Sequence, residues 1–110
     1  MIDWSRVNEL RDEVGAEDFE EVVELFLEEV EEVIARLRNA PELSQLEQDL
    51  HFLKGSALSL GFKAFSDLCQ TGEKLSAEGH SELVETAGIV LCFDQSKSVF
   101  LSELQRNLAA

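Results

Sequence analysis

The strongest structural pattern in the chain lies in residues 18–38, DFEEVVELFLEEVEEVIARLR. Its apolar residues recur at steps of three and four, which predicts an amphipathic helix. Glutamates fill the opposite face, and Arg36 and Arg38 close the segment, where the helix dipole favours positive charge. We interpret the acidic face as a solvated surface, and a docking surface for a basic partner is the alternative.

The residues before this segment predict a shorter helix that ends at Gly15. Asp3 or Ser5 is expected to cap its start, because both side chains accept hydrogen bonds from backbone N–H groups. After the segment, Pro41 is expected in the first turn of a new helix, where its missing N–H costs little. That helix ends at Gly61. Its apolar stripe comprises Leu43, Leu46, Leu50, Leu53, Ala57 and Leu60.

The rest of the chain predicts two further helices, over residues 62–79 and 82–108. The apolar run of residues 89–93 would also suit a strand, but a lone strand would have no partner. Gly88 is placed in the middle of the last helix, at a cost of about 1 kcal/mol relative to alanine. Because short connections make neighbouring helices antiparallel, the sequence predicts an all-α, up-down-up-down antiparallel four-helix bundle. A short additional N-terminal helix completes a single domain over residues 1–110.

The charge of the chain excludes several classes of partner. The 110 residues have a net charge of -14, and residues 1–50 alone hold 16 acidic and 4 basic side chains. Such a surface repels phosphate backbones and anionic lipids, so neither nucleic acid nor a membrane is an expected partner. The first residues lack a signal-peptide pattern, and two cysteines do not make a disulfide framework. A cytoplasmic monomer is the expectation.

The most unusual chemistry lies in residues 48–61, QDLHFLKGSALSLG. On a helical wheel, His51 lies about 130° from the centre of the leucine stripe, and Gly55 lies almost opposite that stripe. A glycine inside a helix costs stability, but it suits a site that something must approach closely. A neutral imidazole, whose pKa in water is about 6.5, accepts a phosphoryl group, and Lys54 one turn away screens the added charge. The pattern therefore points to phosphoryl transfer.

Other reactive side chains are assigned to the surface or to the core. His80 lies in a predicted turn and is interpreted as an ordinary surface residue. Cys69 lies on an apolar stripe and Cys92 lies within the apolar run of residues 89–93, and both are interpreted as core residues.

The motif in this segment resembles the signature of a known family. Residues 51–57, HFLKGSA, followed by Leu60-Gly61, are similar to the H-x-L-K-G-S-x-x-x-L-G signature of histidine-containing phosphotransfer (HPt) domains. The Asp-Trp opening, the acidic helix containing Phe26, and Leu68-Cys69 with Glu73 a turn later also resemble the family pattern. The resemblance covers essentially the whole chain and implies a helical bundle.

The resemblance implies a role for each residue of the motif. His51 would be the phosphoacceptor, modified at Nε2, and Lys54 would pair with the phosphoryl oxygens. Gly55 would leave room for the ring and for the incoming partner. Ser56 matches the small polar position after the glycine.

Further residues enter as supporting or docking candidates. Family members often place a polar residue of the following helix against the histidine, and Gln70 and Glu73 are both candidates that the sequence does not separate. Phe52 and Leu58 are apolar residues near the rim, and each is either a docking contact or a partly buried packing residue.

The function implied is a relay of phosphoryl groups between receiver-domain aspartates. The partners would be response-regulator receiver domains or a hybrid sensor kinase, and the receiver would hold the Mg²⁺. No cofactor, metal or ATP-binding domain is expected on this chain, which would be a carrier rather than an enzyme. The alternatives are a noncatalytic acidic adaptor that binds a basic partner through residues 20–32, and a degenerate HPt domain that only docks receivers.

Overall fold

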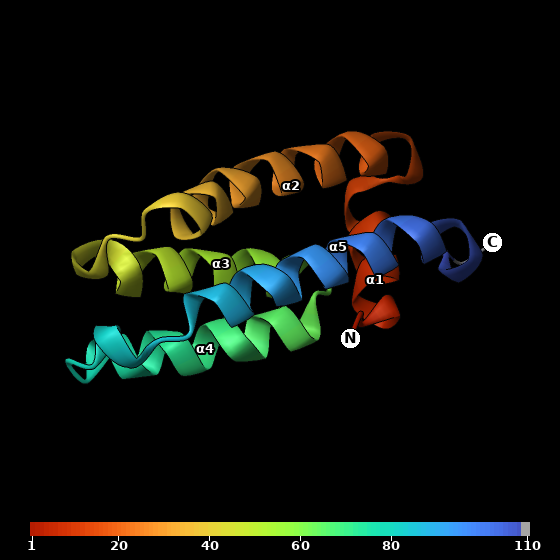
Figure 1. The fold of residues 1–110 in the computed structure, drawn as a ribbon. Coiled ribbons are helices and arrows are strands. Elements are labelled where there is room, and N and C mark those ends of the chain that lie inside the picture. Colours follow the sequence, from red (N-terminus) through yellow and green to blue (C-terminus); the bar gives the residue numbers. More distant parts are fainter. Residues whose placement is uncertain (109–110) are drawn as a thin grey trace.

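The computed structural model describes residues 1–108, which are almost entirely helical. The helices are α1 (Trp4–Val14), α2 (Ala16–Asn39), α3 (Leu46–Leu60), α4 (Lys63–Ala77) and α5 (Thr86–Asn107), with 3₁₀ turns η1 (Leu43–Gln45) and η2 (Ser81–Leu83). Figure 1 shows α2 to α5 running in alternating directions, with α1 across one end. The prediction of an all-α bundle is confirmed, and residues 89–93 are helical.

The four long helices surround one apolar core. α2 and α4 each pack against both α3 and α5, which closes the ring of four helices. Phe62, at the turn between α3 and α4, lies 5.3 Å from Phe100 and 6.3 Å from Phe93 between ring centroids. These rings are almost fully buried, and each contributes roughly 1.5–3 kcal/mol to folding. The turn that follows α3 is therefore held firmly against α5.

The first residues of the chain are hydrogen-bonded to the end of α3. Asp3 is the N-cap of α1, because its Oδ1 accepts the N–H of Arg6 at 3.2 Å. The backbone N–H of Asp3 donates to the Gly61 carbonyl at 2.7 Å. Of the two predicted caps, Asp3 is therefore the one used, and it also joins α1 to the α3–α4 turn.

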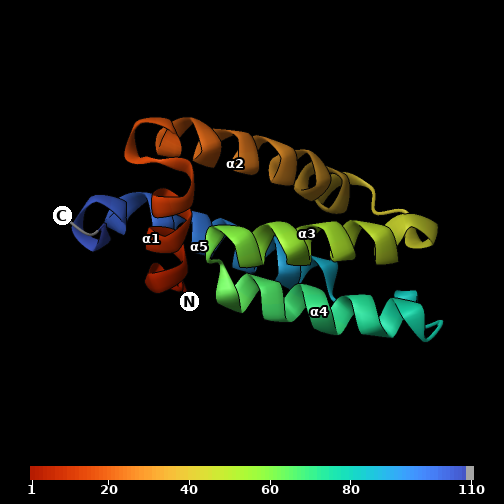
Figure 2. The same ribbon diagram turned by 180° about the vertical axis from the view of Figure 1, so that it is seen from behind.

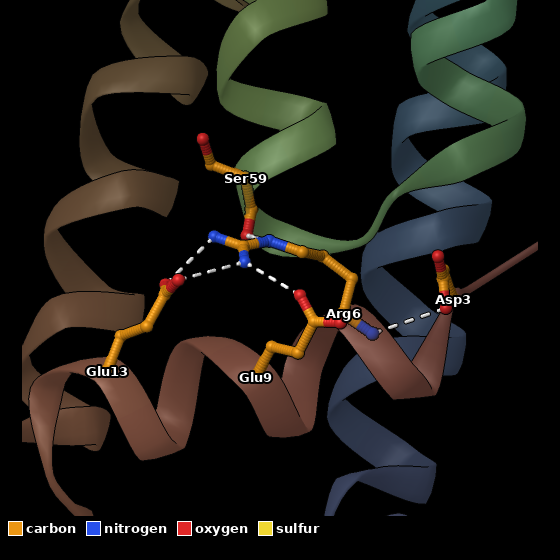
Figure 3. A network of polar contacts seen from close by, with 5 residues as sticks. All are labelled: Asp3, Arg6, Glu9, Glu13 and Ser59. Atoms are coloured by element: carbon orange, nitrogen blue, oxygen red, sulfur yellow. Dashed lines mark hydrogen bonds and ion pairs between the residues drawn. The ribbon is translucent and has the colours of Figure 1, made fainter.

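Arg6 makes a second link between α1 and α3 (Figure 3). Its Nε donates to the carbonyl oxygen of Ser59 at 3.1 Å. Its guanidinium also forms ion pairs with Glu9 and Glu13 on α1. Because the last carbonyls of a helix lack partners within it, Arg6 satisfies one of them and fixes the angle of α1. Seen from behind, α1 crosses beside the end of α3 (Figure 2).

Gly61 ends α3 in a conformation that requires glycine. Its φ is 87°, in the left-handed region. A Cβ at this position would lie 2.8 Å from the backbone oxygen of Asp3 and 2.9 Å from Val7 Cγ2. The predicted stop at Gly61 is confirmed, and the contact with Asp3 adds a packing reason to the conformational one.

The predicted start of the third helix, at Pro41, is wrong. Glu42 is extended, η1 follows, and α3 begins only at Leu46. Leu43, expected on the buried stripe, is 50% exposed. The chain uses residues 40–45 to pass from α2 to the antiparallel α3, so these residues cannot join either helix.

The predicted start of the last helix, at residue 82, is also wrong. Residues 81–83 form η2, Val84 is extended, and α5 begins at Thr86. Gly88 therefore lies in the first turn of α5 rather than in its middle. The full cost of a mid-helix glycine does not apply there, because the first turn contributes few helical hydrogen bonds.

Candidate functional site

α3 separates a buried leucine face from an exposed face that carries the motif. Its buried residues are Leu46, Leu50, Leu53, Ala57 and Leu60. On the opposite face the His51 side chain is 71% exposed, and Gly55 is exposed one turn later. Helical periodicity and the leucine stripe together therefore hold the imidazole in solvent.

Gly55 leaves open space beside His51. A Cβ at Gly55 would meet no atom within 4 Å, so helix packing does not require a glycine here. By contrast, a Cβ at Gly72 on α4 would lie 2.8 Å from Leu50 Cδ1. The glycine at position 55 creates a flat approach to the histidine, and nothing in the fold demands it.

Glu73 on α4 contacts both His51 and Lys54 of α3. Its Oε2 lies 2.8 Å from His51 Nδ1, and its Oε1 lies 2.7 Å from Lys54 Nζ. The Glu73 side chain is 19% exposed and that of Lys54 is 26% exposed. Oε1 itself is buried, and Lys54 is its close charge partner. One carboxylate therefore links the two functional candidates of α3.

The charged state of Glu73 determines which nitrogen of the neutral His51 ring carries the proton. Lys54 above all, and then His51, lower the pKa of Glu73 and outweigh the partial burial that raises it. Glu73 is thus a carboxylate at neutral pH, and a carboxylate only accepts hydrogen bonds. In the neutral ring Nδ1 therefore carries the proton and donates to Glu73, which leaves the lone pair on Nε2.

α4 is held beside α3 by buried contacts next to the site. The Ser66 hydroxyl donates to the Lys54 carbonyl oxygen at 3.4 Å. Cys69 is fully buried, as predicted, and burial raises the pKa of its thiol to about 12. Cys92 is only half-buried and packs against the edge of the core, so the prediction that it is a core residue is confirmed only in part. These contacts fix the rotation of α4 about its own axis, and with that rotation Glu73 faces α3.

Within residues 1–108, no hydrogen bond or ion pair joins the other predicted site residues to the His51 ring. Gln70 is exposed on α4, and Glu73 takes the place beside His51. Ser56 is half-buried. Phe52 is 37% exposed and Leu58 is 55% exposed. The two apolar residues lie on the surface around the motif.

One contact was missed by sequence reasoning. Lys54 was expected only as a partner of the phosphoryl group, whereas in the structure it pairs with Glu73. The sequence signal would have been the opposite charges on two neighbouring antiparallel helices.

Comparison with known proteins identifies the family. A family model described as the Hpt domain matches residues 21–110, which run from within α2 to the end of α5 and contain the whole motif. The chain belongs to the Hpt domain family. Neither a search of curated proteins nor one of solved structures gave a significant match. Hpt domains act in phosphotransfer in two-component signalling, where they interact with receiver domains and kinases.

This Hpt domain contains no helix, among residues 1–108, that has both the length and the apolar character needed to span a bilayer. α1 lies outside the matched residues. It is nevertheless joined to the domain through Asp3 and Arg6.

Proposed function

We propose that this Hpt domain relays a phosphoryl group between receiver-domain aspartates through His51 Nε2. The observation that carries the proposal is the hydrogen bond between His51 Nδ1 and Glu73 on a ring that is 71% exposed. It directs the nucleophilic lone pair to Nε2, at a site that a partner can reach.

The transfer is a substitution at phosphorus. The Nε2 lone pair attacks the phosphorus of a receiver acyl phosphate, and the bond between phosphorus and the aspartate oxygen breaks. The aspartate leaves as a carboxylate, and the Nδ1 proton stays on the ring, bonded to Glu73. Transfer to a second receiver reverses these steps. In-line attack requires free space along the bond axis, which the open surface at Gly55 supports.

Lys54 is proposed to balance the charge during this transfer. The phosphoryl group on Nε2 carries about 1.5 to 2 negative charges, and the positive charge of a ring that keeps its Nδ1 proton offsets them only in part. These negative charges lie close to the Glu73 carboxylate. Lys54 already lies 2.7 Å from that carboxylate, so it offsets the repulsion that Glu73 alone would exert. After transfer, its ammonium group would pair with the phosphoryl oxygens as a point charge. Ser56 is the neighbouring polar group, and its part in the transfer is a minor one in this proposal.

The receiver is proposed to dock around the exposed histidine face. Gly55 provides the flat approach, and Phe52 and Leu58 provide exposed apolar surface on either side. Mg²⁺ is assigned to the receiver, and the chemistry it supplies there is shielding of the phosphoryl charge. The same proposal places the relay in the cytoplasm and describes the chain as a monomeric carrier without kinase activity.

Transfer from a phosphorylated receiver tests this function. The purified chain is incubated with a panel of ³²P-labelled receiver domains from the source organism. We expect label on the wild type, none on His51→Gln, and full label on the control His80→Gln. The label is expected to be stable in base and lost in acid, as for phosphohistidine.

Two results would contradict the assignment. Continued labelling of His51→Gln with unchanged helical circular dichroism would place the phosphoryl group on another residue. A label that is lost in base would indicate an acyl phosphate on a carboxylate.

A further inference from the structure

An apolar groove runs between α2 and α5, on the side of the bundle away from His51. α3 and α4 carry His51 and Glu73, and α2 and α5 lie opposite them in the ring of helices. The groove has a volume of about 290 Å³. Its apolar lining comprises Phe19, Val23, Leu27, Leu101, Leu104 and Leu108. This surface is not used by the proposed phosphotransfer.

A shallower hollow extends the groove along α2. It shares Glu24 and Leu27 with the groove and continues to Ala35. The lining on α2 thus spans residues 16–35, which at 1.5 Å per residue is about 30 Å of helix. That length accommodates four to five turns of a partner helix, roughly 18 residues.

The two walls of the groove differ in character. Glu20, Glu24 and Glu28 lie on successive turns of α2, and none forms an ion pair with any side chain of residues 1–108. On α5, Leu101 lines the groove and is 53% exposed. The groove therefore combines an exposed apolar wall with a row of three glutamates that form no ion pair within residues 1–108. Arg11 of α1 is the single basic residue of its lining, so the charge along the groove is net negative.

We infer that this groove docks a basic amphipathic helix of a partner protein. Such a helix would place apolar residues against Leu101 and the groove floor, and lysine or arginine residues along the glutamate row. A second copy of this chain is disfavoured because each copy has a net charge of -14. Nucleic acid and anionic lipid are repelled by the same charge. The complementary partner is therefore cationic and helical.

The location of the groove allows both surfaces to be occupied together. A receiver at His51 would contact α3 and α4, whereas the basic helix would contact α2 and α5. The groove would hold this Hpt domain near a partner without blocking phosphoryl transfer. The inference does not depend on the phosphotransfer proposal, because binding in the groove is measured without phosphorylation.

A synthetic peptide tests the groove directly. The probe is a helical peptide of about 18 residues with leucines at steps of three and four and lysines elsewhere, and its control is a scrambled peptide of equal composition. We expect amide shifts of the ¹⁵N-labelled chain in residues 16–35 and 97–108, and not around His51. Affinity should fall with added salt, because exposed charges are screened.

Matched variants separate the groove from net charge. Glu20→Lys/Glu24→Lys/Glu28→Lys is compared with Glu42→Lys/Asp67→Lys/Glu78→Lys, which makes the same change of charge at exposed positions outside the groove. We expect affinity to fall about tenfold or more in the first and about twofold or less in the second. Leu101→Ser should also weaken binding, whereas Leu91→Ser, exposed elsewhere on α5, should not.

Three results would overturn the inference. Equal loss of affinity in both triple variants would show that the peptide responds only to net charge. Amide shifts centred on His51 would place the peptide on the other face. A dimer of the free chain that Leu101→Ser dissociates, measured by sedimentation, would show that a second copy covers the groove.

Discussion

At the scale of single residues, the bond from Glu73 to His51 distinguishes this site from an ordinary surface histidine. Sequence reasoning kept Gln70 and Glu73 as equal candidates. They lie three residues apart, hence only about 60° apart on a helical wheel, and both angles fit a contact with α3. The rotation of α4 separates them, and it is set by buried residues such as Phe65 and Cys69. That rotation is a property of packing and is not visible in the sequence of α4.

The charge on Glu73 gives the fold a specific pH dependence. Because the pKa of Glu73 is lowered in the folded state, its stabilisation is complete above the unfolded pKa, about 4.3. It is lost as the pH falls through the lower folded pKa. We expect Glu73→Gln to lower the free energy of unfolding by about 1 kcal/mol at pH 7. The difference from wild type should shrink as the pH falls below the unfolded pKa and vanish once Glu73 is protonated in the folded state.

Urea unfolding of both proteins at several pH values measures this difference. Glu78→Gln, an exposed carboxylate at the end of α4, is the control and should show almost none. A loss of stability in Glu73→Gln that does not vary with pH would mean that the side chain acts through packing rather than charge. In the labelling assay, Glu73→Ala should slow transfer more than Glu73→Gln. The amide oxygen of the glutamine can still accept a hydrogen bond from the Nδ1–H group of His51, whereas alanine cannot.

At the scale of elements, the existence of every helix follows from apolar periodicity, whereas several boundaries do not. The Gly61 end of α3 could be predicted because a left-handed glycine stop has a local sequence signal. The starts of α3 and α5 could not be predicted from the sequence. They follow the 3₁₀ turns η1 and η2, and those turns pack against each other at one end of the bundle.

Replacing three glycines by alanine tests which of these positions require glycine for stability. Gly55→Ala should stabilise the fold by about 0.5–1 kcal/mol, because the site is helical and open. Gly79→Ala should cost about 1 kcal/mol for its φ of 85° alone. Gly61→Ala should cost more, roughly 2–3 kcal/mol, because its Cβ also meets Asp3 and Val7. Thermal unfolding ranks the three variants.

The same series separates stability from access at Gly55. Gly55→Arg should keep the helical circular dichroism and block labelling by receivers, whereas Gly55→Ala should be labelled nearly as well as wild type. Unfolding of Gly55→Arg would contradict the open surface at this position. Normal labelling of a folded Gly55→Arg would show that the partner approaches from another direction.

At the scale of the whole molecule, the bundle and its exposed histidine could be predicted from sequence, and its cross-links could not. The stripes on each helix define which residues are buried, but not which helices become neighbours. The hydrogen bond from Arg6 to Ser59 joins residues that lie 53 positions apart. No pattern in the local sequence predicts it. The ion pair between Arg38 and Asp94 across α2 and α5 is similar, because many other pairings of charge were equally consistent with the sequence.

The distribution of charge makes stability depend on salt. The net charge is -14, and much of it lies unpaired on α2, so the folded chain repels itself at low ionic strength. We expect the melting temperature to rise by about 2–5 °C between roughly 10 mM and 150 mM NaCl. Glu20→Gln/Glu24→Gln/Glu28→Gln should melt higher at low salt and respond less to added salt. A wild-type melting temperature that does not change with salt concentration would contradict this account.

Trp4 gives the molecule a built-in optical probe. It is the single tryptophan of a chain without tyrosine, and its ring stacks on Phe100 with centroids 5.8 Å apart. It lies beside the Gly61 end of α3, on the order of 15 Å along the helix axis from His51. Its emission therefore reports whether α1 is seated on α5, and should stay constant when the histidine is phosphorylated. Fluorescence can thus follow unfolding in every variant above without a signal from the phosphoryl group.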